Sequence, residues 1–343
     1  MNSGTGAFDV LEAPRIEAYL SENIEGFQGP IEFEVFEAGQ SNPTFLITTP
    51  DKKYVLRKKP EGDLLKSAHA VDREYRVQKA LWDTEVPVVR MLHLCEDQSV
   101  LGTAFYVMEY AEGRIFWDPA LPELASDERQ EVYAEMARVL AEIHSVDLQT
   151  SRLESFGRAD GYYSRQLKLW TTQYEASRTE NLPEMDGLRC WLEENLPSDS
   201  GKVSLVHGDY RIDNLMFAPD SLKIIAVFDW ELSTLGDPLA DLAYQIMQRA
   251  MGRDWYLRGL EGLDTDALGI PSELQYVEAY CGSRGIKEIE HWNFARAFAF
   301  YRFAAICQGV KRRGLDGNAA SPDAARVGAM AAPLARLGYR LVH

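Results

Sequence analysis

Two carboxylates and one amide stand at the ends of short apolar segments in the middle of the chain. One apolar run precedes the polar segment 207-HGDYRIDN-214, and a second, 224-IIAVFDW-230, contains Asp229 at its end. If these runs form neighbouring strands, Asp209, Asn214 and Asp229 come together. Oxygen donors without thiolates or paired histidines suit Mg²⁺ better than Zn²⁺. The pattern therefore predicts a site for a hard cation.

The spacing of these groups matches the catalytic signature of protein kinases, H-R-D-L-x-x-x-N. His207, Asp209 and Asn214 have the same separations, and Asp229 follows an apolar strand as the aspartate of D-F-G does. In phosphoryl transfer the first aspartate accepts the hydroxyl proton, and the asparagine and second aspartate hold magnesium ions on the phosphates. We therefore predict that Asp209 is catalytic and that Asn214 and Asp229 are metal ligands. His207 is expected to be a packed residue that shapes the loop.

Each of these residues also has a simpler interpretation, because Asp and Asn are common in turns and helix caps. The occurrence of all three at kinase spacing favours the catalytic interpretation. Arg211 could neutralise the transferring phosphoryl group, or it could hold the loop through a carboxylate. The sequence leaves both roles open for Arg211, while Asp213 is expected to be a turn residue.

The elements that must position these groups change in type along the chain. Short β-branched and aromatic runs predict strands in the first third, interrupted by one helix, and helical periodicity dominates beyond Gly113. This predicts an α+β protein with two lobes, residues 1–110 and 111–343. The predicted strands are 31–39, 44–48, 54–59, 88–95 and 104–110. The predicted helices are 14–23, 67–83, 127–147, 161–178, 185–196, 238–251, 271–283, 288–313 and 322–341.

The segments 206-VHGDYRIDNLMF-217 and 228-FDWELSTLGDPLADLAY-244 resemble the aminoglycoside phosphotransferase and choline kinase-like superfamily. They look most like the subgroup whose members also occur fused to acyl-CoA dehydrogenase modules. The resemblance covers nearly the whole chain and implies a protein-kinase-like bilobal fold, with a small sheet-rich N-terminal lobe and a larger, mainly helical C-terminal lobe. It further implies a phosphotransferase that uses ATP and Mg²⁺ and takes the hydroxyl group of a small molecule as acceptor. The motifs are specific for the fold and only weakly specific for the acceptor.

The resemblance also assigns residues in the first third of the chain. In the strand 54-YVLRKKP-60, Val55 and Arg57 fall on one face and match the alanine and lysine of the kinase V-A-I-K strand. Val55 would lie under the adenine and Arg57 at the phosphates, with a bidentate fork in place of a point charge. Lys58, on the opposite face, is the second candidate. Glu74 would pair with the cation, although an exposed pair within its own helix is the simpler alternative.

The segment 39-GQSNPTF-45 stands where kinases place a glycine-rich loop, yet it lacks those glycines. Ser41, Asn42 and Thr44 would offer hydroxyl, amide and backbone donors to phosphate instead. The segment 107-VMEYAEG-113 resembles the kinase hinge, whose backbone binds the adenine edge. The residues expected there are Met108, Glu109, Tyr110 and Ala111.

The acceptor site is expected in the helical lobe, between the catalytic loop and the helices after Gly161. Trp230 and Glu231 directly follow Asp229 and are expected to face the acceptor. The helical segment 162–177 offers weaker candidates, because aromatic residues at helical spacing are more often core. These are Tyr163, Arg165, Lys168, Trp170 and Tyr174. Nearby, Asp237 and Pro238 predict a helix start, and Asp241 is expected to brace the catalytic loop.

Composition excludes several other classes. The formal charge of −17 argues against broad nucleic-acid or anionic-membrane binding, although it allows one anionic ligand in a locally basic pocket. No run of consecutive apolar residues approaches the length of a membrane span, and no secretory signal is apparent. Four scattered cysteines indicate free thiols in a reducing compartment, so we expect a cytoplasmic protein.

The main hypothesis is a metabolic kinase whose acceptor is a hydroxyl group, for example that of a hydroxyacyl thioester. The alternatives are an aminoglycoside or amino-alcohol phosphotransferase and a nucleotide-binding pseudokinase scaffold. Retention of Asp209, Asn214 and Asp229 weighs against the scaffold. The acceptor, the preference for ATP or GTP and the oligomeric state stay open at this point.

Overall fold

The computed structural model describes residues 13–36, 42–60, 70–199, 201–317 and 323–343. The chain divides into two compact units. The first runs to Gly113 and also includes Ile225–Glu231, and the second holds Arg114–Ile224 and Leu232–His343. The division expected after residue 110 stays a prediction, and each unit is described by itself below.

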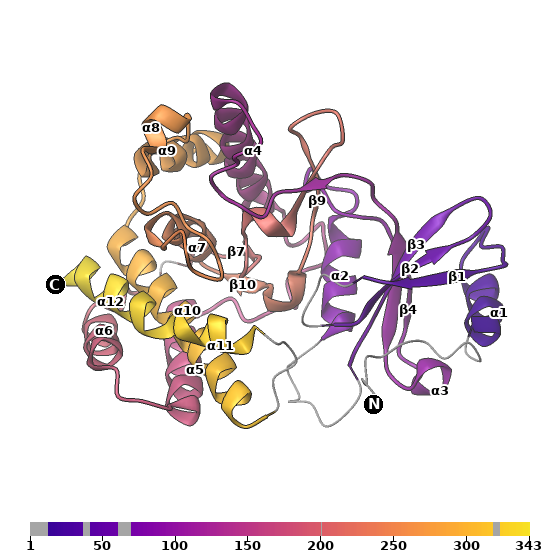
Figure 1. Cartoon of the computed structure of the whole chain (residues 1–343), viewed down its shortest axis with the longest axis horizontal. Coiled ribbons are helices and arrows are strands. Elements are labelled where there is room, and N and C mark those ends of the chain that lie inside the picture. The colour runs from indigo at the N-terminus through magenta and orange to yellow at the C-terminus, as the bar shows by residue number, and fades with distance from the viewer. Residues whose placement is uncertain (1–12, 37–41, 61–69, 200, 318–322) are drawn as a thin grey trace. The chain divides into compact units, whose positions relative to one another are not determined.

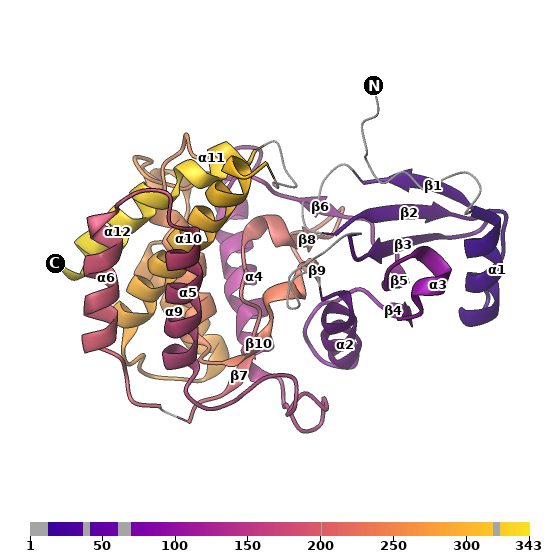
Figure 2. The same ribbon diagram turned by 90° about the horizontal axis from the view of Figure 1, so that it is seen from below.

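The first unit is built on a five-stranded antiparallel sheet in the order β1-β2-β3-β5-β4 (Figures 1 and 2). Alternation in β2 explains its position, because Phe45 and Ile47 are fully buried while Leu46 between them is partly exposed. Phe45 pairs with Leu56, which lies in the same core. The strands are β1 Glu32–Val35, β2 Thr44–Thr48, β3 Lys53–Lys58, β4 Met91–Cys95 and β5 Phe105–Glu109. The helices are α1 Ala13–Asn23, α2 Val71–Leu81 and α3 Gln98–Leu101.

The second unit is mainly helical and has its core around α10, Trp292–Leu315. This helix contacts α5, α6, α7, α11 and α12, and Figures 1 and 2 show it among them. Most of its length is apolar, which suits a helix covered on most sides. The other helices are α4 Ser126–Ser145, α5 Tyr162–Ser177, α6 Pro183–Glu194, α7 Leu239–Met247, α8 Thr265–Leu268, α9 Glu273–Arg284, α11 Ala324–Ala329 and α12 Ala331–Val342.

Short strands of the second unit carry the loops of interest. Strand β7, Ser204–Val206, pairs antiparallel with β10, Thr234–Gly236, and β6, Arg114–Ile115, pairs with β8, Leu215–Phe217. Strand β9, Ile224–Val227, follows β8 after a turn and from Ile225 on belongs to the first unit. Three-residue helical turns occupy Ile212–Asn214, Trp230–Leu232 and Gln248–Ala250.

The predicted sheet-rich first part and helical remainder are confirmed, with several boundary corrections. The predicted helix 127–147 begins one residue earlier, at Ser126, and ends at Ser145, and the Glu128 side chain accepts from the Ala125 amide just before it. The predicted helix 322–341 is two helices, α11 and α12. Residues 67–69 of the predicted helix 67–83 lie outside the described residues. Among the helices that are described, none is both long enough and apolar enough to cross a bilayer.

Candidate active site

The loop that carries Asp209 connects β7 to the helical turn Ile212–Asn214. Asn214 Nδ2 donates to the Asp209 backbone oxygen at 2.8 Å and to Asp209 Oδ2 at 3.1 Å. Its amide oxygen makes no hydrogen bond within the part of the chain that the structure describes. The amide is therefore oriented with its nitrogen on the aspartate and its oxygen left as a ligand for a cation, which fits a magnesium site.

Arg211 lies between two carboxylates of this loop. Its Nε is 3.1 Å from Asp209 Oδ1, and its Nη2 is 3.2 Å from Asp213 Oδ2. Of the two roles that the sequence leaves open, the geometry shows the one that holds the loop. Asp213 is accordingly an ion-pair partner as well as part of a turn.

The environment of Asp209 keeps it ionised. Burial alone would raise its pKa, but the Arg211 guanidinium and a hydrogen bond from Tyr244 outweigh burial, so the pKa lies below its ordinary value. Asp209 is therefore a carboxylate at neutral pH and can accept a hydrogen bond from an acceptor hydroxyl.

The backbone of the loop is bound on both sides by charged side chains. Asp241 accepts from the amides of His207, at 2.6 Å, and Gly208, at 2.8 Å. Arg302 donates from Nη2 to the Gly208 carbonyl at 2.6 Å. Gly208 has φ +87°, and a Cβ there would lie 2.6 Å from the Leu232 carbonyl oxygen, so a larger residue does not fit. The expectation that Asp241 braces the catalytic loop is confirmed.

Two buried side chains connect Asp241 to α9. His144 Nε2 lies 3.2 Å from Asp241 Oδ2, and His144 Nδ1 lies 2.7 Å from the Tyr280 hydroxyl. Asp241 is fully buried, yet hydrogen bonds from His144 and the loop amides hold its pKa below the ordinary value against the effect of burial. No motif in the sequence points to His144, because a single histidine at a helix end has no fixed separation from other candidate site residues.

Arg302, which bonds the Asp209 loop, belongs to no motif that the sequence reveals. It is 5% exposed and lies near the rings of both Trp170 and Tyr244, 5.4 Å and 5.2 Å from their centroids. Contact with two aromatic faces stabilises a buried guanidinium. The signal in the sequence is a single charge inside the apolar run 297-AFAFYRFAAIC-307.

In the first unit, Arg57 and Glu74 form the predicted ion pair. Arg57 Nε is 3.3 Å from Glu74 Oε2, and Arg57 Nη2 is 3.6 Å from Asp229 Oδ1. Glu74 also accepts from Asn42 Nδ2 at 3.1 Å and from the Tyr106 hydroxyl at 2.9 Å. The alternative of an exposed pair within the helix is wrong, since Glu74 is 1% exposed and its partners come from other elements.

The pKa values of both charged groups are raised, but for different reasons. Burial raises the pKa of Glu74 to about 7, and Arg57 only partly offsets it. Burial would lower the pKa of Arg57, but the charges of Glu74, Tyr106 and Asp229 outweigh it and raise that pKa. Arg57 therefore stays charged, while Glu74 changes its charge near neutral pH.

Glu74 should make folding stability fall as the pH rises. Its pKa is about 7 in the folded protein, above the ordinary 4.5, so its contribution is complete below pH 4.5 and is lost as the pH rises through 7. Between pH 5 and 8 the loss should be on the order of 2 kcal/mol. Urea unfolding of the wild type and Glu74→Gln at several pH values measures it, because the glutamine cannot titrate.

Glu22→Gln is the matched control, because Glu22 is exposed on α1. Its pH dependence of unfolding should match that of the wild type. If Glu74→Gln also retains the full wild-type slope between pH 5 and 8, the titration does not belong to Glu74.

Asp229 has an unusual backbone conformation, with φ +63°, which few residues other than glycine adopt. Carboxylate oxygens of Glu74, Asp229 and Glu231 lie within 4.8 Å of one another. Such a cluster of oxygens is a donor set for a hard cation, and Arg57 offsets part of its charge. The residues present thus fit a magnesium site at Asp229. Glu231 belongs to this cluster.

The remaining nucleotide-site predictions fall on two segments. Ser41 lies outside the described residues. The Asn42 amide nitrogen is used by Glu74, and the Thr44 hydroxyl donates to the Asn42 carbonyl at 3.0 Å. These two side-chain donors are therefore bonded within the protein.

The segment expected to bind adenine ends strand β5. Met108 pairs with Val55, and both side chains are buried at 7% and 6% exposure. The Glu109 amide donates to the Arg90 carbonyl, whereas the Ala111 amide donates to no group of the described chain. The backbone amide of Tyr110, between them in the chain, donates to the Lys53 carbonyl at 3.4 Å. The apolar side chains of Met108 and Val55, together with the Ala111 N–H, suit the binding of a planar heterocycle.

Most of the acceptor candidates suggested by sequence lie in the core. Trp230 is fully buried and donates to the Val227 carbonyl, so the expectation that it faces the acceptor is wrong. Tyr163 and Tyr174 are buried in the helical core. Trp170 differs from these aromatic candidates, because it contacts a side chain bound to the catalytic loop, namely Arg302.

The chain is similar in sequence to known proteins over most of its length. A family model described as "Phosphotransferase enzyme family" matches residues 32–273. Mouse acyl-CoA dehydrogenase family member 10 is 48% identical over 312 residues, 91% of this chain and 29% of that protein. Human acyl-CoA dehydrogenase family member 11 is 41% identical over 336 residues, 96% of this chain and 43% of that protein. The chain thus spans less than half the length of these relatives.

Solved structures of phosphotransferases and of a choline kinase are similar to this chain as well. A protein from Ralstonia eutropha, with the provisional name aminoglycoside phosphotransferase, superposes with a TM-score of 0.88 at 44% identity, covering 96% of this chain and 97% of that one. Choline kinase from Cryptosporidium parvum has a TM-score of 0.62 at 12% identity, with coverage of 95% and 92%. A thermostable mutant of the aminoglycoside phosphotransferase APH(4)-Ia, solved with AMP-PNP and hygromycin B, has a TM-score of 0.63 at 17% identity, with coverage of 96% and 99%. The fold is that of the kinase-like phosphotransferases, and the chain belongs to the phosphotransferase enzyme family.

Proposed function

We propose that the protein is an ATP- and Mg²⁺-dependent kinase that transfers the γ-phosphoryl group to a hydroxyl group of a small metabolite. The observation that carries this proposal is the loop of Asp209. Its carboxylate is held ionised, Asn214 is bonded to it, and Asp241 fixes the two preceding amides. Phosphoryl transfer depends mainly on such positioning, because the transition state needs little covalent help from the protein.

Each residue has one role in this proposal. Asp209 orients the acceptor hydroxyl and takes its proton, and Arg211 keeps that carboxylate in place. Asn214 and Asp229 hold Mg²⁺, which supplies charge neutralisation on the phosphates. Arg57, fixed by Glu74, contacts the phosphates and takes precedence over Lys58, because its Nη2 lies 3.6 Å from Oδ1 of Asp229, the proposed metal ligand. Met108, Glu109, Tyr110, Ala111 and Val55 would surround the adenine.

Use of ATP is supported by the related fold that binds AMP-PNP. The lobes 1–110 and 111–343 are proposed to provide the nucleotide site and the acceptor site. A location in the cytoplasm also stays a prediction, and four free cysteines agree with it.

For the acceptor we propose a hydroxyacyl thioester. The support is the similarity to the mouse and human proteins named as acyl-CoA dehydrogenase family members, which points to acyl thioesters as the related chemistry. The acceptor hydroxyl is proposed to lie at the Asp209 carboxylate, which accepts a hydrogen bond from Tyr244. Arg302, covered by the rings of Trp170 and Tyr244, donates to the Gly208 carbonyl and so holds the loop of this carboxylate.

The test is release of ADP with ATP and Mg²⁺ across hydroxyacyl-CoA thioesters, simple alcohols, amino alcohols and aminoglycosides. Phosphorus NMR identifies the product as a phosphate monoester. We expect turnover with at least one hydroxyacyl thioester and none with the matching acyl thioester that lacks the hydroxyl. Turnover confined to amino alcohols or aminoglycosides would overturn the acceptor assignment and leave the kinase assignment intact.

A second candidate, an aminoglycoside phosphotransferase, is favoured by the similarity to the Ralstonia eutropha protein with that provisional name. Expression in a sensitive bacterial strain should raise the inhibitory concentration of an aminoglycoside if this candidate is correct. A nucleotide-binding scaffold is the remaining outcome. It would bind ATP without a requirement for Mg²⁺ and would phosphorylate no acceptor in the panel.

Asp229→Asn should remove the magnesium-dependent part of ATP binding. A ligand that binds only the folded state raises its stability, so Mg²⁺ with ATP should raise the Tm of the wild type more than ATP alone. We expect the variant to show equal shifts with and without Mg²⁺. Asp220→Asn, an exposed turn residue, is the control and should behave as the wild type. A retained Mg²⁺ effect in Asp229→Asn would contradict the ligand assignment.

A further inference from the structure

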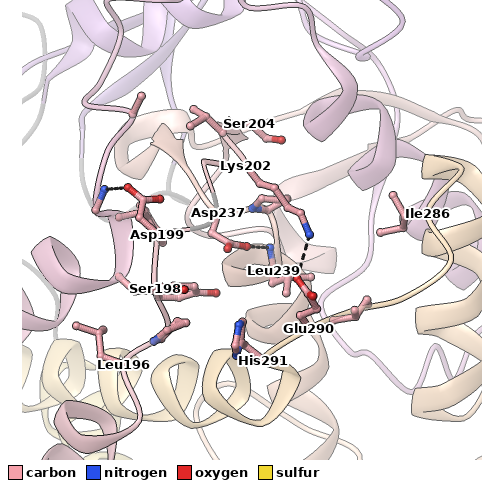
Figure 3. A pocket seen from close by; sticks show the side chains of 18 of the residues that line it. Leu196, Ser198, Asp199, Lys202, Ser204, Asp237, Leu239, Ile286, Glu290 and His291 are labelled. Atoms are coloured by element: carbon pink, nitrogen blue, oxygen red, sulfur yellow. Dashed lines mark hydrogen bonds and ion pairs between the residues drawn. The ribbon is translucent and has the colours of Figure 1, made fainter.

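The second unit contains a pocket of about 510 Å³ at the start of β7, whereas the catalytic loop follows the end of that strand (Figure 3). This volume lies in the range of small-molecule sites. Its walls come from the start of α5, the segment before β7, the first turn of α7, the end of α9 and residues 286–291. It includes neither Asp209 nor Arg302, so it is distinct from the proposed acceptor site.

Asp237 lines this pocket and forms no ion pair with the residues that the structure describes. Its Oδ1 accepts from the Leu239 amide at 2.9 Å, and the other oxygen has no partner within the described chain. Burial raises the pKa of this carboxyl, which the Leu239 amide only partly offsets. A partly buried carboxylate with one unused oxygen gains most from a cation that brings its own charge.

Four other charged side chains of the lining have partners of their own. Lys202 pairs with Glu290 at 3.4 Å, as Figure 3 shows, and Asp199 accepts from the Gly161 amide. Arg284 donates to the Ser145 hydroxyl. The lining holds four carboxylates, against one lysine, one arginine and one histidine, so the pocket favours a cation.

Apolar and aromatic side chains form the rest of the wall. Leu196, Leu239 and Ile286 line the pocket together with Tyr162. Such a lining accepts a hydrocarbon body and leaves one place for an ammonium group, beside Asp237. Aromatic faces also attract cations. The chemistry that fits is a small organic amine with an apolar body.

The wall of the pocket continues into the support of the catalytic loop. Tyr280 belongs to the wall, and its hydroxyl bonds His144, which bonds Asp241. Asp241 in turn accepts from the amides of His207 and Gly208. Asp237 also precedes α7, and Asp241 lies in the first turn of that helix. A ligand that displaces Tyr280 or the start of α7 can therefore change how firmly the loop is held.

We propose that this pocket is a regulatory site for a small organic ammonium ion, with Asp237 as its counter-ion. The regulatory role rests on the proposed kinase function, whereas the binding itself does not. Amine binding and its effect on the loop are both measured without ATP. A negative result in either test is therefore distinguishable from a failure of the kinase assignment.

The binding test uses 2-phenylethylamine and its neutral analogue 2-phenylethanol, titrated against the wild type by calorimetry or ligand-observed NMR. We expect the amine to bind at least about tenfold more tightly than the alcohol, and Asp237→Asn to remove that preference. Asparagine keeps the oxygen that accepts from Leu239, so this variant should fold. Ile286→Trp fills the pocket with Asp237 intact and should weaken both probes.

Two further variants locate the site. Glu288→Gln removes a carboxylate of the same lining and should leave the affinity within about twofold, because Asp237 and not the summed charge binds the amine. Asp209→Asn should also leave it unchanged. Loss of amine binding in Asp209→Asn but not in Asp237→Asn would place the amine at the catalytic loop and overturn the proposal. Equal affinity for amine and alcohol in the wild type would overturn it as well.

The regulatory role is tested by hydrogen exchange at the amides of His207 and Gly208. Saturating amine should change their exchange rate at least about threefold in the wild type and not in Tyr280→Phe, which lacks the hydroxyl that bonds His144. Unchanged exchange in the wild type at saturation would overturn the regulatory role.

Discussion

Asp209→Asn should lower kcat for the responding acceptor by about a hundredfold to ten-thousandfold, the usual contribution of a general base. The amide cannot take the hydroxyl proton. It also places an N–H₂ group where Asn214 Nδ2 and Arg211 now donate, at 3.1 Å and 3.3 Å. Steady-state release of ADP, with the acceptor and MgATP both saturating, measures the change. The KM for ATP should change less than kcat, because no residue of the proposed nucleotide site is replaced.

The control for this variant is Asp220→Asn, an exposed aspartate in the turn after β8, which should retain wild-type turnover. The pH profile gives an independent reading of the same assignment. The pKa of Asp209 is lowered, chiefly by Arg211 acting against burial, so ionisation of this group should not limit kcat between about pH 6 and 8. A kcat within about tenfold of wild type in a folded Asp209→Asn protein would show that Asp209 is not the base.

Asp241→Ala should lower the free energy of unfolding by about 3 to 5 kcal/mol, the usual cost of removing one partner from a buried charged network. The change leaves the amides of His207 and Gly208 and the ring of His144 without their acceptor. Each such buried donor carries a desolvation cost of its own. Urea unfolding measures the loss. Turnover should fall as well, because the backbone of the Asp209 loop loses its two hydrogen bonds to Asp241.

Asp266→Ala is the matched control, because Asp266 is exposed in α8, and its effect should stay within about 0.5 kcal/mol. If Asp241→Ala fails to fold, Asp241→Asn keeps one acceptor oxygen and gives the measurement. The pKa of Asp241 is lowered in the folded protein, so its contribution is present above the ordinary value of 3.8 and is lost as the pH falls below it. A stability equal to wild type in both variants would contradict the bracing role.

Local patterns predicted the parts of the fold that local forces determine. The β-branched and aromatic residues of 44–48 correctly predict β2, because such side chains suit a pleated, half-buried surface. The separation of Asp209 from Asn214 predicted a contact that the loop geometry shows. Short elements were missed, including α3, α8 and the two-residue strand β6, since they contain too few residues to show a period.

Long-range packing produced the features that the sequence could not predict. Arg302 reaches Gly208 across 94 positions of the chain, and Tyr280 reaches His144 across 136. No spacing rule connects residues that far apart. Trp230 shows the opposite error, because its place next to Asp229 suggested a ligand contact while the fold buries it completely.

Asp241 holds His207 and Gly208 through their main-chain amides. Every residue except proline carries such an amide, so this support is insensitive to the identity of the side chain at position 207. Gly208, in contrast, is constrained by its own φ and by Leu232. Side chains that do not bond the loop can therefore change while these two hydrogen bonds persist, whereas His207, Arg211 and Asn214 are constrained, because the side chain of each bonds Asp209. The main-chain support thus leaves the positions around the loop, and not the loop itself, open to evolutionary change.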